Sequence, residues 1–291
     1  MSLKFTLVAG LAAAVSLASS FPGSFPKQHD SRICGAPEPR AEQLSTTHWF
    51  PTEEGGGSGL RHAKKDTITV EVYVHVIAAD ETKGSGYVTR EDVNAQMRVL
   101  NDKFSKGHIS FILKDVDWAV NKNWTNNGDI LNRKKTLRNG SYSALNLYYV
   151  NQIGQGYLGG CGFPLDAKPG SFDFYWDGCT MLFTTMPGGS AANANEGKIT
   201  VHEVGHWFGL MHDSDNMGSG CSSPGDGIDD TPPVLVPLFG CPTGTDSCPD
   251  QPGVDPIHNF MAYTDDYCQT EFTQGQIDRT WSNWHRYREG K

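Results

Sequence analysis

The chain has little positive charge and few long apolar runs. It carries 24 Lys and Arg against 33 Asp and Glu, a formal net charge of −9. A nucleic-acid partner requires a basic face, so this balance argues against one. After the N-terminal 20 residues, no stretch is apolar enough to span a membrane. A chain of 291 residues with 33 Gly and 16 Pro is long enough for one large, loop-rich domain or two small ones.

The N-terminus, MSLKFTLVAGLAAAVSLASS, has the pattern of a secretory signal peptide. Lys4 gives a positive start, residues 5–17 form an apolar run too short for a spanning helix, and small residues follow. We expect a signal peptide over residues 1–18, or to residue 20, and hence a secreted, extracellular protein in a compartment where disulfides persist. Sequons at Asn123 and Asn139 are expected to be glycosylated there.

Residues 19–64 lack hydrophobic periodicity and are typical of a pro-segment or flexible arm. Regular structure is predicted from DTITVEVYVHVIAAD, whose alternating apolar residues indicate a strand. A helix capped by Thr89 follows in VTREDVNAQMRVLNDKF, and Val93, Met97, Leu100 and Phe104 recur in it at helical spacing and should face the core. Three more strands are predicted in HISFILKDVDW, SALNLYYV and CTMLFTTM. This order indicates an α/β fold with a twisted sheet.

The second half of the chain has less regular structure. NANEGKITVHEVGHWFGL predicts a helix that Asn195 or a neighbour caps and Gly209 ends. Residues 212–272 are nearly all loop, and so long a loop region needs cysteines or metal ions to hold it together. A last helix is predicted from Thr273, with Gln276 completing a capping box.

The stretch HEVGHWFGLMH is typical of a zinc site. His202 and His206 are four residues apart, so a helix places both imidazoles on one face as ligands of one ion. Glu203 would take a proton from a zinc-bound water and pass it to a leaving amine. A turn at Gly209 would bring His212 to the metal as the third ligand. The alternative is a helix with two solvated histidines, but its apolar neighbours predict burial, where unpaired imidazoles are costly.

The extended pattern H-E-x-x-H-x-x-G-x-x-H resembles that of the metzincin metalloproteases. Metzincins have a methionine beneath the metal, and Met261 in HNFMAYTDD would take that place, the alternative being an ordinary core methionine. Tyr263 is placed like a tyrosine near the metal in several metzincins. From there it would donate a hydrogen bond to the developing oxyanion.

Longer segments resemble the pappalysin family of metzincins, and within it the small secreted fungal extracellular metalloproteases. These segments are YYVNQIGQGYLGGCGFP, EGKITVHEVGHWFGLMHD, GCSSPGDGIDDTPP and DPIHNFMAYTDDYCQTEFTQGQIDRTWSNWHRYR. The resemblance implies a metzincin catalytic domain over residues 65–291, with an upper subdomain over 65–209 and a loop-rich lower subdomain over 210–291. It implies that the chain is a zinc-dependent endopeptidase acting on extracellular proteins. We expect this endopeptidase to be a monomer.

Two alternatives to a pappalysin-like peptidase remain. Asp213 after the third histidine is a departure from the pappalysin pattern that is found in the adamalysin family, so an adamalysin- or astacin-like peptidase is one alternative. A disulfide between Cys221 and Cys248 would disfavour it. The other is a binding or adhesive protein on a metzincin scaffold. Such proteins usually lack the general base or a metal ligand, and neither is missing here.

The chain has seven cysteines, so one is left over when six pair. Cys161 and Cys179 flank a hairpin-like loop and are expected to pair. The four cysteines of the loop region allow three pairings, so the residues alone do not decide between them. The family resemblance implies the pairs Cys221–Cys248 and Cys241–Cys268.

The remaining cysteine, Cys34, lies in SRICGAPEPR behind the signal peptide. A thiolate is a good zinc ligand. RICGAP resembles the cysteine-switch segment of metzincin zymogens, which implies that Cys34 fills the fourth zinc position and keeps the enzyme latent until the pro-segment is removed. The alternative is an intermolecular or stray thiol.

A Gly-rich turn, GDGIDDTP, presents oxygen atoms of the kind that calcium prefers. The candidate ligands are Asp226, Asp229, Asp230 and Thr231. The resembling family has members with calcium near this position. On the ligand rules alone, a solvated acidic turn is an equal alternative.

Overall fold

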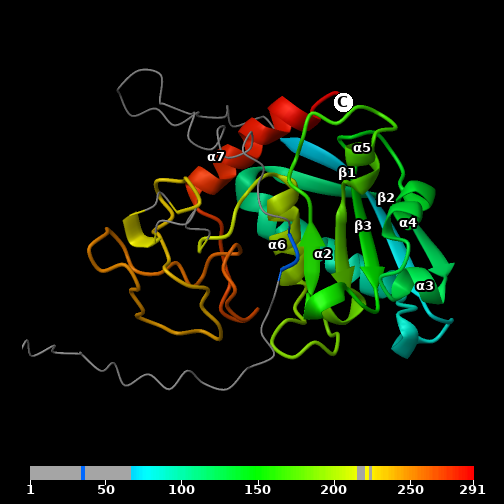
Figure 1. Cartoon of the computed structure of the whole chain (residues 1–291), viewed down its shortest axis with the longest axis horizontal. Helices are drawn as coiled ribbons and strands as arrows, with labels where there is room; N and C mark the ends of the chain where they lie inside the picture. Colours follow the sequence, from blue (N-terminus) through cyan, green and yellow to red (C-terminus); the bar gives the residue numbers. More distant parts are fainter. Residues whose placement is uncertain (1–33, 37–66, 215–219, 223–224) are drawn as a thin grey trace, which may run out of the picture. The chain divides into compact units, whose positions relative to one another are not determined.

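The structure is a computed structural model, and it describes residues 34–36, 67–214, 220–222 and 225–291 (Figure 1). The expected signal peptide and all of the expected arm except residues 34–36 lie outside the described residues. Within the part that is described, no helix is long and apolar enough to cross a membrane.

The described chain is organised around one five-stranded sheet with the order β2-β1-β3-β5-β4. The first four strands of that order run parallel, and β4 pairs antiparallel with β5 at the edge. Helices surround the sheet, which confirms the α/β fold class (Figure 1). The strands are β1 (Ile68–Ala78), β2 (Ile109–Val120), β3 (Leu145–Val150), β4 (Gly159–Cys161) and β5 (Cys179–Leu182).

The core forms where β1 meets α2 (Arg90–Phe104). Thr89 begins the helix through a capping box, in which its hydroxyl accepts the Asp92 N–H at 3.2 Å and its own N–H donates to the Asp92 carboxylate at 2.9 Å. The apolar stripes predicted for both elements are buried. They comprise Ile68, Val70, Val72, Val74 and Val76 of β1, and Val93, Met97, Leu100 and Phe104 of α2.

The sequence pattern did not predict the short elements. They are α3 (Lys122–Thr125), α4 (Ile130–Leu137), α5 (Phe172–Trp176), the 3-10 turns η1 (Lys83–Ser85), η2 (Ser105–Gly107), η3 (Gly154–Gly156), η4 (Phe183–Thr185) and η5 (Gly220–Ser222), and the π-helical turn η6 (Trp284–Arg288). In α4 the buried side chains are Arg133 and Lys134, so no apolar stripe marks this helix in the sequence.

The predicted histidine-bearing helix is α6 (Lys198–Trp207), and all of its residues are buried. The prediction that Asn195 or a neighbouring side chain caps it was wrong. The N-cap is Gly197, at φ 80° and with no side-chain cap, while the Asn195 amide donates to the Gly189 carbonyl at 2.8 Å. Gly209, at φ 90°, lets the chain turn out of the helix as predicted.

The last helix, α7 (Gln274–Asn283), begins at the predicted Thr273–Gln276 capping box and continues as η6. Arg288 of η6 is fully buried, pairs with Asp177 at 2.9 Å and donates to the Trp207 carbonyl at the end of α6. Burial alone would raise the pKa of Asp177, but Arg288 and Arg138 outweigh it and hold that pKa below its usual value. This buried pair joins the C-terminal segment to α6.

Three disulfides connect the loops and strands. Cys161–Cys179 joins β4 to β5, and the other two bridges lie in the loop region between α6 and α7. All three expected pairs are present, the latter two being Cys221–Cys248 and Cys241–Cys268. The Cys221–Cys248 bridge disfavours the adamalysin- or astacin-like alternative.

Candidate metal centre

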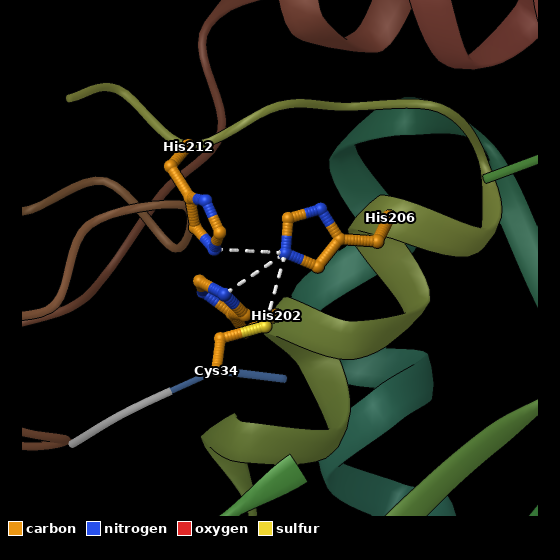
Figure 2. Close-up of side chains that lie close together, drawn as sticks. All are labelled: Cys34, His202, His206 and His212. Atoms are coloured by element: carbon orange, nitrogen blue, oxygen red, sulfur yellow. Dashed lines mark hydrogen bonds between the residues drawn. The ribbon is translucent and has the colours of Figure 1, made fainter. Parts of the chain in front are cut away.

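Three imidazole nitrogens meet beside α6 (Figure 2). Nε2 of His206 lies 3.2 Å from Nε2 of His202 and 3.1 Å from Nε2 of His212. The first two rings project from one face of the helix, and the turn at Gly209 returns the chain so that His212 faces them. The structure therefore brings together the three histidines that the motif singled out.

Hydrogen bonds on the far side of two rings determine which nitrogens face the centre. Nδ1 of His202 donates to the Phe260 carbonyl at 2.8 Å, and Nδ1 of His206 donates to the Leu210 carbonyl at 2.7 Å. A carbonyl only accepts, so each neutral ring carries its proton on Nδ1. The Nε2 lone pairs of both rings therefore face the centre, an arrangement that a bound cation stabilises.

The donor set fits a zinc ion. Zn–N bonds of about 2.0–2.1 Å in a tetrahedron place the nitrogens about 3.3–3.4 Å apart. The observed separations of 3.1 and 3.2 Å are close to that value. The Cys34 Sγ lies 3.4 Å from the His206 Nε2, and a Zn–S bond of about 2.3 Å would require about 3.5–3.6 Å. All four ligand atoms lie within 4.8 Å of one another.

Pairing with β4 positions Cys34 at this centre. The residue forms a parallel β-bridge with Gly159, and the next N–H, that of Gly35, donates to the Gly159 carbonyl at 2.8 Å. The Ala36 N–H donates to the Cys34 sulfur at 3.3 Å. The segment 34–36 therefore runs along β4, with its sulfur directed at the histidines (Figure 2).

Glu203 is a residue of α6, is 1 % exposed, and its side chain extends to β4. A Cβ added at Gly159 would come within 2.5 Å of the Glu203 Oε1, so the carboxylate rests against bare backbone. Sequence reasoning missed this role of β4, because a strand of three residues is too short to show alternation. The glycines of YLGGCGFP were the available signal.

The two predicted residues of the lower region also lie at the centre. Met261 is fully buried under α6, where a Cβ at Gly205 would lie 2.5 Å from the methionine sulfur. The Tyr263 hydroxyl lies 3.1 Å from the His212 Nε2. Phe163, which the sequence did not single out, packs edge-on against His206 with ring centroids 5.3 Å apart.

The predicted calcium ligands are less closely gathered. Asp226 is buried, which raises its pKa to about 7, and Thr231 is buried as well, whereas Asp229 and Asp230 are exposed. The Asp230 carboxylate accepts a backbone N–H in the first turn of α7 at 2.9 Å, and Arg279 donates to the Asp226 carbonyl at 2.8 Å. Among the described residues, none of these carboxylates joins a group of three or more metal-ligating side chains. Calcium at this turn stays a prediction.

The two sequon asparagines are exposed. Asn123 lies in α3 and Asn139 follows α4. Glycosylation of both stays a prediction.

Known proteins resemble this chain along its whole length. A family model described as Pregnancy-associated plasma protein-A, in the peptidase M43 family, matches residues 175–283. An extracellular metalloprotease of Colletotrichum graminicola is 44 % identical over 290 residues, covering 99 % of this chain and 100 % of that one. An extracellular metalloprotease of Neurospora crassa is 42 % identical, with coverage of 99 % and 98 %. In fold, the chain is similar to mature mirolysin of Tannerella forsythia in complex with a cleaved peptide, with a TM-score of 0.63, 24 % identity and coverage of 75 % and 92 %.

Proposed function

Because this chain belongs to the peptidase M43 family and is a metalloendopeptidase, we propose that it is secreted and uses zinc to hydrolyse peptide bonds in extracellular proteins. One observation carries the assignment of the metal: the imidazole nitrogens of His202, His206 and His212 converge with separations of 3.1 and 3.2 Å. The relatives' description as extracellular supports secretion.

Zinc, when bound, supplies Lewis acidity at the scissile carbonyl. In this proposal Glu203 is the general base. It takes a proton from the attacking water and passes it to the leaving amine nitrogen. Its buried position against Gly159 supports this role, because the carboxylate then lies where β4 meets the segment 34–36. Tyr263, whose hydroxyl lies at His212, donates a hydrogen bond to the developing oxyanion.

Cys34 keeps the uncleaved chain latent by occupying the fourth zinc position. Its sulfur lies 3.4 Å from the His206 Nε2, and the Ala36 N–H that it accepts stabilises a thiolate. Pairing of residues 34–36 with β4 also covers the strand edge along which a substrate would pair. Removal of this segment frees both the fourth zinc position and the edge of β4.

A Glu203→Gln variant tests the mechanism. We expect it to retain zinc and the fold and to lose at least about 10²-fold in kcat, because general acid–base catalysis contributes that much or more. Zinc content and casein cleavage of the matured enzyme are the measurements. Glu91→Gln, at an exposed position on α2, is the matched control and should cleave like wild type. Cleavage by Glu203→Gln at the wild-type rate would refute the role of Glu203. Zinc binding without any cleavage by wild type would indicate a binding protein instead.

Latency has its own test. A Cys34→Ala chain with its N-terminal segment intact should cleave a peptide without prior processing, whereas wild type should require that processing. Cys34→Ser, with a weaker ligand atom, should fall between the two. A Cys34→Ala chain as latent as wild type would show that this sulfur does not block the site.

A further inference from the structure

A pocket of about 260 Å³ lies directly beside the metal centre, along β4. Gly160 and Cys161 of β4 and Gly35 of the bound segment line it on one side. Its other walls come from the loop between α3 and α4, from α4, from the loop that follows β3, and from α5. Apolar side chains form most of these walls, namely Ile130, Ile153, Tyr157 and Trp176.

The charged residues that line this pocket are both basic. Among the described residues, Arg133 and Lys134 line it and no Asp or Glu does, although the chain as a whole has 33 acidic and 24 basic residues. Arg133 is 1 % exposed and donates to the Trp124 carbonyl at 2.7 Å. Its Nε has no hydrogen-bond partner among the described residues. A buried guanidinium with an unused N–H is costly unless a hydrogen-bond acceptor or an anion reaches it.

Asp177 is a buried carboxylate whose charge favours protonated Lys134, but its own ion pairs are with other residues. Asp177 is held by Arg288 at 2.9 Å and by Arg138 at 3.4 Å. Lys134 donates to the carbonyls of Trp176 at 2.6 Å and Gly178 at 2.8 Å. Within the described part of the chain, no carboxylate makes a hydrogen bond to this ammonium group. Burial lowers the pKa of Lys134 to about 7, so an anion in the pocket would favour its charged form.

The bound segment shows how a substrate would reach the pocket. The Cys34 sulfur lies with the three histidine nitrogens, and Gly35, the next residue, lines the pocket. Gly35 has no side chain, and a Cβ there would come within 2.6 Å of the Tyr157 ring, so a substrate side chain at this position requires that ring to shift. Its backbone hydrogen bond to Gly159 is of the kind that any peptide adding to this strand edge can make. A substrate residue near the scissile bond would therefore place its side chain at this pocket.

We propose that this pocket is a substrate subsite that selects an acidic side chain, Asp or Glu, within two residues of the scissile bond. The inference rests on the proposed peptidase function and adds a substrate preference to it. The aliphatic part of the side chain packs on the apolar walls, and the carboxylate approaches Arg133 and Lys134.

Gly162 allows a test that leaves these buried bases in place. It lines the pocket, its φ is not positive, and an added Cβ would meet no atom within 4 Å. Gly162→Asp therefore introduces a competing carboxylate at little steric cost. Gly162→Asn is the matched control, with nearly the same shape and no charge.

The experiment is cleavage of a peptide library by the full chain after maturation, read by mass spectrometry. We expect acidic residues to be enriched at one position within two residues of the cleaved bond. For a peptide with Glu at that position, Gly162→Asp should lower kcat/KM about tenfold, because the new carboxylate repels the substrate carboxylate and competes with it for the two basic groups. For the same peptide with Gln in place of Glu, Gly162→Asp should change kcat/KM little. Gly162→Asn should have a kcat/KM near that of the wild-type enzyme for both peptides.

The outcomes separate this inference from the proposed function. Cleavage without acidic enrichment overturns the subsite and leaves the peptidase function standing. Equal losses of kcat/KM for the Glu and Gln peptides in Gly162→Asp would also overturn it. Such losses would show a steric effect of the substitution, which is the same for a charged and an uncharged substrate side chain. Failure of wild type to cleave any peptide would overturn both. A Glu preference that weakens as salt rises would support an electrostatic origin.

Discussion

Residues 67–209 contain all five strands and α2 to α6, whereas the described part of residues 210–272 contains one 3-10 turn, η5 (Figure 1). The first region, here called the sheet region, supplies nearly all of the main apolar core. The second, the loop region, holds two disulfides and contributes little to that core. Burial of apolar surface stabilises the sheet region, and covalent bridges restrict the loop region.

The metal centre combines these two kinds of structure. His202, His206 and Glu203 come from a fully buried helix, while His212, Met261 and Tyr263 come from the loops. A buried helix fixes the positions of its side chains through packing, whereas the positions of side chains on loops depend on the disulfides that cross-link the loops. Substitutions in the sheet region should therefore affect the centre through lost core packing, and removal of a disulfide should affect it through loosening of the loops.

The largest expected effect comes from the core of the sheet region. Leu100→Ala removes a fully buried side chain of α2 and should lower the free energy of unfolding by about 2–5 kcal/mol. Urea unfolding followed by far-UV circular dichroism measures this change. The matched control is Val236→Ala, at a side chain 53 % exposed in the loop region, which should change stability by less than about 0.5 kcal/mol. Equal losses in the two variants would contradict this contrast between the regions.

Next in size is the loss of one bridge in the loop region. Cys221→Ala combined with Cys248→Ala opens a loop with a sequence separation of 27. It should cost about 3.5 kcal/mol if restriction of the unfolded chain dominates. Hydrogen exchange should accelerate in residues 225–272 and stay slow in β1 and β3, with peptidase activity lost alongside. Uniform acceleration in both regions would show that they unfold as one unit.

Per pH unit, the smallest expected effect concerns Asp226 in the loop region. Because burial raises its folded-state pKa from 3.8 to about 7, the folded protein binds the extra proton in that range. Stability from this group is complete below about pH 4 and is lost as pH rises towards 7, by at most about 1.4 kcal/mol per pH unit. Thermal unfolding between pH 4 and 7 measures the slope, and Asp226→Asn should remove it.

Added calcium provides a second test of Asp226. An ion at Asp226 would favour the ionised carboxylate, so added calcium should raise Tm more at pH 7 than at pH 5. The Asp226→Asn variant should lose most of that response. An unchanged Tm at pH 7 would indicate the solvated-turn alternative.

The sequence predicted the parts whose signals repeat over many residues. The alternation in β1 and the apolar stripe of α2 were both found buried, and the HExxH spacing placed His202 and His206 on one helix face. It missed β4 and α4, for two different reasons. A strand of three residues shows no period, and a helix whose buried residues are Arg133 and Lys134 shows no apolar stripe. The pocket proposed as a subsite is lined by both of these missed elements.

The sequence by itself determined the chemistry of the centre, because three histidines, a glutamate and the turn at Gly209 lie within eleven consecutive residues, 202–212, where helix geometry and one turn define their positions. Only the tertiary structure decided what faces that centre. The contact of Glu203 with Gly159, the place of Cys34 on β4 and the basic pocket beside it all join segments far apart in the chain. Local spacing carries no information on such contacts, because they depend on the pairing of the sheet edge.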